Sequence, residues 1–361
     1  YHNEHIKNII NNWTKTSGSE EITLTIDGKE FPMHSFKSQA KDPRNGFNVA
    51  GGDIMYRLEP IKNNEEYVNM QIANGLYELL GFKTKNIQLA ETAEGLYALS
   101  ETFSLKGGFV QNDKDVAAKV YGINILLGNE LEGAISSAKL DSNKTPIIMR
   151  PTLNFNKYMI ALFKNPPATK NEVIMSLENV ANLKDDDIIQ IVKKYNPEKP
   201  EKLISGLLDR KRFITKFLEN VKSTDQEGLP LKEFLEKIYY DVNAEEQYLL
   251  LQKTTDTSFT DFLQKEYNLN HKELLGFRKI IHHPELATYL KEKLQNGEIS
   301  KDDLVAFTNS VIGETTAFQT FISEKPEKKI EISNILFDLN KNHNIPFRSG
   351  YLMVLKLAQN D

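Results

Sequence analysis

The chain has few of the side chains that usually carry covalent or metal chemistry, and their spacing matches none of the common catalytic motifs. It contains no cysteine, which excludes thiolate metal sites and cysteine nucleophiles. Seven histidines are scattered along the chain, and only His282 and His283 are adjacent. Neighbouring helical residues point in different directions, so this pair does not predict a metal site. HExxH, G-x-S-x-G and Walker A motifs are absent from the sequence. Charged side chains and glycine-containing loops are therefore the candidates for function.

Basic and acidic side chains are nearly balanced. Of the 361 residues, 45 are basic and 50 are acidic, which gives a net charge of −5. A protein that binds duplex nucleic acid normally carries a basic excess, so this class of function is disfavoured. Hydrophobic residues make up 40% of the chain, as in ordinary globular proteins, and the length predicts two or three domains. No apolar run approaches the ~20 residues that a membrane-spanning helix needs, so the chain is not predicted to span a membrane.

Residues 20–105 combine several strand patterns with a single helical pattern. Apolar and polar residues alternate on both sides of Asp27-Gly28, a dipeptide typical of tight turns, and predict a hairpin over residues 21–34. Residues 40–52 are rich in Gly, Asn and Pro and are predicted to form a loop. The predicted order is three strands, one helix ending at Gly81, and two strands. The third strand, the helix and the last two strands are predicted at residues 53–60, 64–80, 85–92 and 95–103.

The pattern beyond residue 106 is mainly helical. It is interrupted by a predicted hairpin over residues 139–149, and Asp185–Asp187 supply the acidic side chains that favour a helix N-terminus. The chain is therefore predicted to have four parts. These are a short N-terminal helix, a strand-rich part, a first helical part and a second helical part, with bounds 1–19, 20–105, 106–222 and 223–361.

This order of elements resembles the protein-kinase-like fold. More narrowly, residues 20–220 are similar to the divergent branch that contains HipA-like toxin kinases, phosphoinositide kinases and effector kinases of intracellular bacteria. The resemblance implies an α+β fold with two lobes: a small antiparallel sheet with one inserted helix (20–105), then a helical lobe (106–222). Residues 223–361 would form an appended α-helical domain. It also implies phosphate transfer from ATP, with Mg²⁺ or Mn²⁺ as the metal.

The resemblance assigns nucleotide-binding roles to residues around the third predicted strand. Gly51 and Gly52 would form the loop that covers the phosphates, although the two glycines by themselves favour a plain hairpin loop. Arg57 stands where the family has a phosphate-contacting lysine, and its rigid guanidinium would hold phosphate with a different geometry. Glu66, or its neighbour Glu65, would be the partner of this cation. Acidic residues in the first turn of a helix are also favoured by the helix dipole alone.

The resemblance places the remaining nucleotide and catalytic positions further along the chain. The main chain at Ser100 and Glu101 would meet the adenine, unless these residues are a simple linker. Glu130 occupies the position of the catalytic aspartate. Arg150 occupies the position of the metal-binding aspartate, and a guanidinium cannot ligate Mg²⁺, which requires oxygen donors. The alternative for Arg150 is a surface residue at a strand end. No set of metal ligands is predicted.

A run of three cations, Arg210 to Arg212, follows the paired residues Leu207 and Leu208. The resemblance places this run on a late helix of the helical lobe. Taken alone, the run predicts a helix with an exposed basic face.

Our leading hypothesis from the sequence is a degenerate kinase-like protein, a pseudokinase. It would be a bacterial effector that is secreted into the host cell cytoplasm and binds a host protein, a nucleotide or both. One alternative is an active, atypical ATP-dependent kinase acting on protein or phosphoinositide, with the metal held by Glu130, Asp141, Asp113 or Asp115. The other alternative is a nonenzymatic, α-helical interaction protein without a sheet. Anionic lipids or inositol phosphates are further candidate ligands, at the basic patches Lys325, Lys328 and Lys329, and Lys341 with Arg348.

Overall fold

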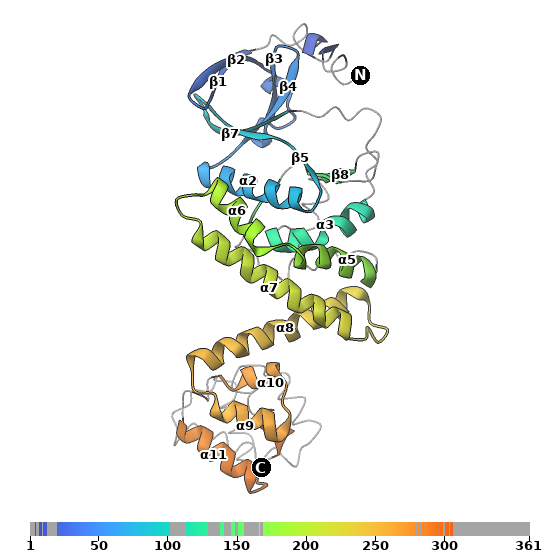
Figure 1. Ribbon diagram of the computed structural model, residues 1–361, viewed down its shortest axis with the longest axis vertical. Coiled ribbons are helices and arrows are strands. Elements are labelled where there is room, and N and C mark those ends of the chain that lie inside the picture. The colour runs from blue at the N-terminus through green and yellow to red at the C-terminus, as the bar shows by residue number, and fades with distance from the viewer. Residues whose placement is uncertain are drawn as a thin grey trace, which may run out of the picture. The chain divides into compact units, whose positions relative to one another are not determined.

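The computed structural model divides the chain into two compact units, residues 1–238 and 239–361. Unit 1 combines a strand-rich part with helices, and the described part of unit 2 is helical (Figure 1). The structure describes residues 4, 7–8, 10–12, 20–101, 113–128, 138–140, 146–148, 151–154, 166, 169–278, 281, 284–298, 300–302 and 304–305.

Six antiparallel strands of unit 1 form a closed barrel (Figure 1). The barrel is a sheet of six strands rather than the five predicted, and its presence excludes the all-helical alternative. Its strands, in the order in which they neighbour one another, are β1 (Glu20–Ile26), β2 (Lys29–Ser35), β3 (Phe47–Gly51), β4 (Ile54–Pro60), β7 (Gly95–Glu101) and β6 (Ile87–Thr92).

The β1–β2 hairpin forms as its sequence predicts. Strands β1 and β2 pair along seven positions, from Glu20 with Ser35 to Ile26 with Lys29. Asp27 and Gly28 both have positive φ angles, 50° and 75°, as the two central residues of a type I′ turn require.

The prediction of a loop over residues 40–52 is wrong in its second half, because strand β3 lies there. Val49 is fully buried and Phe47 nearly so, and both pack in the barrel core. Burial of these side chains outweighs the turn-forming composition around them. The first half of this segment does contain a short 3-10 helix, η2 (Pro43–Asn45), and another, η1 (Lys37–Gln39), lies just before the segment.

The barrel interior is filled by apolar side chains, of which Leu24, Val49 and Leu58 are fully buried. Its wall is closed between β1 and β6 by a single pair of residues, Thr25 with Glu91. This is the shortest pairing among the described barrel strands.

Helix α2 (Asn64–Leu79) packs on the outside of the barrel. Its Met70 contacts Ile87 and Ala98, which lie on the outer face of β6 and β7. The helix begins at the N-cap residue Asn63 and is followed by Gly81, whose φ of 81° suits a residue just beyond a helix. Helix α2 is therefore inserted between β4 and β6, as predicted.

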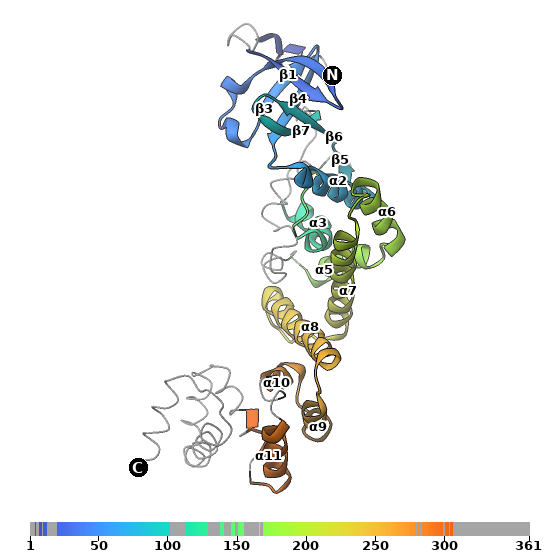
Figure 2. The same ribbon diagram turned by 90° about the vertical axis from the view of Figure 1, so that its left-hand side faces the viewer.

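The rest of unit 1 consists of helices and a small sheet. Figure 2 shows α5 and α7 running close together, as they also do in Figure 1. Gly122 of α3 lies against α5: a side chain there would place its Cβ 2.3 Å from the carbonyl oxygen of Ser176. The helices are α3 (Asp113–Leu127), α5 (Lys170–Ala181), α6 (Asp185–Tyr195) and α7 (Glu201–Ser223), and the sheet contains β5 (Lys83–Thr84), β9 (Pro146–Ile148) and β8 (Ala138–Leu140).

Helix α8 (Leu231–Thr254) begins in unit 1 and continues into unit 2. In unit 2 the hydroxyl of Tyr248 on α8 donates to Asp261 Oδ1 at 2.7 Å, and this side chain of α9 also accepts from Gln252 and Thr257. The further described helices are α9 (Ser258–Tyr267), α10 (His271–Gly276) and α11 (Pro284–Gln295). Among the helices that the structure describes, none combines the length and apolar character needed to cross a membrane.

Candidate functional site

Arg57 lies on the outer wall of the barrel. Its neighbours in β4, Tyr56 and Leu58, pack on the barrel core, and alternate strand residues face opposite sides. The guanidinium donates from Nη2 to the carbonyl oxygen of Asn45 at 3.2 Å, and its Nε lies 3.9 Å from Glu59 Oε1. Arg57 thus ties β4 to the turn that precedes β3.

Glu66 serves the N-terminus of α2. Its carboxylate accepts a hydrogen bond from the Lys62 N–H at 2.8 Å, and its own N–H donates to Asn63 Oδ1 at 3.0 Å. Main-chain N–H groups at a helix start need such partners. The carboxylate is therefore used for capping rather than for an ion pair with Arg57.

The other predicted nucleotide contacts are spread along two strand pairs. Ser100 of β7 stands directly opposite Arg57 in the β4–β7 register, so the structure brings these two residues together. Glu101 is exposed at the end of β7. Gly51 and Gly52 lie at the β3–β4 turn, three residue pairs along the ladder from Arg57, and the φ of Gly52 is +62°.

Glu130 and Arg150 lie outside the described residues, as does Asp141. Asp113 and Asp115 belong to the first turn of α3. Within the part of the chain that the structure describes, histidine and acidic side chains nowhere gather in a group of three that could hold a metal ion.

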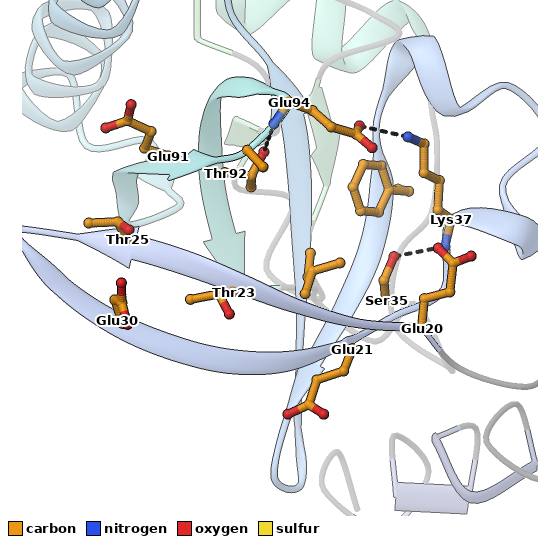
Figure 3. A pocket seen from close by; sticks show the side chains of 13 residues that line it. Glu20, Glu21, Thr23, Thr25, Glu30, Ser35, Lys37, Glu91, Thr92 and Glu94 are labelled. Atoms are coloured by element: carbon orange, nitrogen blue, oxygen red, sulfur yellow. Dashed lines mark hydrogen bonds and ion pairs between the residues drawn. The ribbon is translucent and has the colours of Figure 1, made fainter.

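A cavity of about 540 Å³ lies at the side of the barrel where β1 faces β6 and the β6–β7 turn (Figure 3). Phe47 contributes apolar surface to it, and the hydroxyl side chains of Thr23, Thr25 and Ser35 also line it. Its most frequent lining residue is glutamate, contributed by β1, β2, β6 and the β6–β7 turn: Glu20, Glu21, Glu30, Glu91 and Glu94.

Lys37 is the only basic residue among the described residues that line this cavity. Its Nζ lies 2.7 Å from Glu94 Oε2, and Figure 3 shows the two side chains pointing toward each other. The hydrogen bond to Glu94 raises the pKa of Lys37, and the same bond lowers the pKa of Glu94. Both groups therefore stay charged at neutral pH.

The charge of the cavity decides which ligands suit it. Five carboxylates against one ammonium give a negative potential, which attracts cationic groups and repels phosphates. Sequence reasoning missed this site because its glutamates lie far apart in the sequence. They come together only where β1 meets β6, at Thr25 and Glu91.

The prediction that Arg210, Lys211 and Arg212 form an exposed basic face of α7 is wrong for Arg210. Arg210 is only 8% exposed, whereas Arg212 is exposed and pairs with Asp209 at 3.8 Å. Lys211 Nζ contacts Asp185 Oδ1 at 2.5 Å. Successive helical residues are rotated by about 100°, so a run of three cations cannot occupy one face.

Comparison with known proteins finds a distant structural likeness. No family model matches the chain, and no curated protein matches it. Among solved structures, the chain is similar to the Helicobacter pylori proinflammatory kinase CtkA, with 10% sequence identity and a TM-score of 0.25. The similarity covers 54% of this chain and 91% of that one.

Proposed function

We propose that this chain is a degenerate kinase-like protein whose first unit binds ATP with little ordinary phosphate transfer. The observation that carries the proposal is the insertion of α2 between β4 and β6 of an antiparallel sheet, followed by a helical part. Kinases use an inserted helix in this way to place a carboxylate near the nucleotide. Helix α2 also contacts the helical part, because Tyr77 donates to Asn124 Oδ1 of α3 at 3.0 Å.

The proposal of impaired transfer rests on the charged side chains. An active kinase needs the cation–carboxylate pair between strand and helix, together with an aspartate on the metal. Here Arg57 is held by Asn45 and Glu59, while Glu66 caps α2. The sequence also has Arg150 in place of the metal-binding aspartate. The acidic barrel cavity is not the phosphate site in this proposal, because its glutamates repel phosphate.

Calorimetric titration of the full chain with ATP, with and without Mg²⁺, tests the proposal. We expect ATP to bind, with an affinity that Mg²⁺ changes little. Arg57 contributes to binding through its positive charge in this proposal, even though Asn45 and Glu59 hold its guanidinium in place. Replacing Arg57 with alanine should therefore weaken ATP binding about tenfold, because this charge would no longer attract the phosphates. Arg44→Ala is the matched control, because this exposed side chain pairs with Asp42 within its own turn.

Two results would contradict the proposal. A wild-type chain that binds no ATP would overturn it. Robust Mg²⁺-dependent phosphate transfer that disappears in Arg57→Ala would replace it with the active-kinase alternative. Thermal unfolding of each variant shows whether a loss of binding comes from a loss of folding.

A further inference from the structure

Strand β1 is paired along its whole length on one side, but at one residue only on the other side. All seven of its residues pair with β2, whereas β6 pairs with β1 only at Thr25. Strand β6 ends at Thr92, one residue after the partner of Thr25. Among the described residues, no strand therefore lies beside residues 20–24 of β1 on that side (Figure 3). We call these residues the open edge of β1.

The register shows which main-chain groups point away from β2 along the open edge. In a two-residue hairpin the pair next to the turn, here Ile26 with Lys29, exchanges hydrogen bonds, and such pairs alternate with pairs that do not. Thr23 belongs to a pair of the second kind, and its partner Pro32 fits this because proline has no N–H to donate. The N–H and C=O groups of Thr23, and by the same alternation those of Glu21, therefore point to the side without a neighbour.

The acidic cavity follows the open edge. Four consecutive residues of β1, Glu20 to Thr23, line it. Consecutive strand residues face opposite sides of a sheet, so a cavity that contacts all four lies against the edge of the strand rather than against one face. Its volume of about 540 Å³ is within the range of ligand pockets. The open edge is about 16 Å long, which gives room for an extended segment of about five residues.

Carboxylates without partners determine the charge that such a segment needs. Glu30 and Glu91 stand opposite Thr25 on its two sides, and Figure 3 shows one on each side of it. Glu21 lies on the same face of β1, four residues before Thr25. None of the three glutamates has an ion-pair partner among the described residues. Like charges on neighbouring strands repel one another, and cations from a bound segment would relieve this repulsion.

One ammonium group, that of Lys37, already lies in the cavity. Its Nζ is 2.7 Å from Glu94 Oε2 and 5.7 Å from the centre of the Phe47 ring. A carboxylate and an aromatic face both attract a cation. Lys37 thus shows how a lysine side chain is accommodated here, and its single charge cannot neutralise the five glutamates of the cavity.

We propose that the open edge of β1 binds an extended segment of a partner protein that carries lysine or arginine on alternate residues. The segment adds a strand to the sheet, and its main chain pairs with the N–H and C=O groups of Glu21 and Thr23. Its basic side chains meet Glu21, Glu30 and Glu91, whereas an acidic segment is repelled. The residues of the proposed ATP site take no part, so this proposal does not rest on the proposed function.

A synthetic hexapeptide of alternating lysine and threonine, blocked at both ends, is the probe. Its control is the same peptide with every main-chain nitrogen methylated, which has the same charge but no main-chain N–H to donate. Calorimetric titration of the full chain at low salt should show binding of the unmethylated peptide only. Hydrogen exchange at Glu21 and Thr23 should become slower in its presence, because their N–H groups gain partners.

Variants of the full chain separate main-chain pairing from charge. Thr23→Pro removes an N–H that points away from β2, so it should weaken peptide binding by about tenfold or more while the β1–β2 hairpin stays paired. Thr23→Ala keeps this N–H and should bind like wild type. Glu21→Gln should weaken binding about threefold. Glu198→Gln removes one charge from an exposed residue outside the cavity and should have no effect.

Three results would overturn the proposal. The first is equal affinity for the methylated and unmethylated peptides, which would show attraction by charge without an added strand. The second is a wild-type chain that binds neither peptide. The third is wild-type affinity in a folded Thr23→Pro chain, with folding checked by thermal unfolding. If Thr23→Pro does not fold, the methylated peptide and the hydrogen exchange of Glu21 and Thr23 still decide.

Discussion

At the scale of single residues, helix α7 shows that burial can be predicted from the sequence pattern, whereas the contacts of a buried residue cannot. Leu207, Ile214, Phe217 and Val221 recur at helical spacing and are buried. Arg210 occupies the next position of the same stripe, three residues after Leu207 and four before Ile214. That register is the signal that could have predicted its burial. Which groups it would meet could not be predicted, because the carbonyl groups of Leu126 and Asn154 come from distant segments.

Gly128 offers a test at this scale, and Gly228 is its matched control. Both have a φ of +75°, but a Cβ at Gly228 would have no atom within 4 Å. Alanine at Gly228 should cost only the left-handed backbone penalty of about 1–2 kcal/mol. Alanine at Gly128 should lower the free energy of unfolding by more than about 3 kcal/mol, because its Cβ would also clash with the Asn154 carbonyl oxygen. Denaturant unfolding measures both, and equal losses would contradict the close contact at Gly128.

At the scale of elements, local sequence patterns predict the individual strands better than they predict the closure of these strands into a barrel. Alternation and the Asp27-Gly28 turn predict β1 and β2, and helical spacing predicts α2. Strand β3 was missed because its flanking Gly and Asn residues also suit a loop, and β5 because it has only two residues. Closure by Thr25 and Glu91 has no local signal. The acidic cavity depends on that closure and was missed for the same reason.

A contact between α8 and α9 should make the free energy of unfolding depend on pH in the alkaline range. Burial, helped by the neighbouring Asp261 carboxylate, raises the pKa of Tyr248 from its ordinary value near 10 to about 12. The neutral phenol therefore stabilises the folded state fully below about pH 10, and this contribution is lost as the pH rises toward 12. Tyr248→Phe should be less stable than wild type by about 1 kcal/mol near neutral pH, because the hydrogen bonds of the phenol are lost.

The difference in unfolding free energy between the two proteins should shrink between about pH 10 and pH 12. Denaturant unfolding at several pH values measures it. The buried Tyr121, whose pKa is also raised by desolvation, is present in both proteins and cancels in the difference. A difference that stays constant with pH would show that Tyr248 does not titrate in the folded state as we expect.

At the scale of the whole molecule, each unit has a hydrophobic core of its own. Leu24 and Val49 are fully buried in unit 1, and Leu274 and Phe277 are fully buried in unit 2. Composition and length could predict more than one domain, but not where the chain divides, because α8 runs through the division without a break in its helical pattern. Continuous helices give no local signal of a domain boundary.

Because each unit has its own hydrophobic core, we expect the two units to unfold in separate transitions. Scanning calorimetry of the full chain should show two transitions, and a chain ending at Thr254, the end of α8, should keep the one that belongs to unit 1. Its midpoint should move by no more than about 4 °C, the shift expected for a change of about 1 kcal/mol in a unit of this size. A single transition that the shortened chain loses altogether would show that the two units fold as one.

The single pair Thr25–Glu91 has a consequence for how copies of this protein behave toward one another. Where its strands are paired, a closed ring offers no free edge on which a second chain could extend the sheet. Parting this pair would uncover two edges at once, one on each side of the opening. The glutamates beside it give both edges negative charge, and like charges on two molecules repel. We therefore expect the acidic residues beside Thr25 and Glu91 to oppose the joining of two copies through these strands.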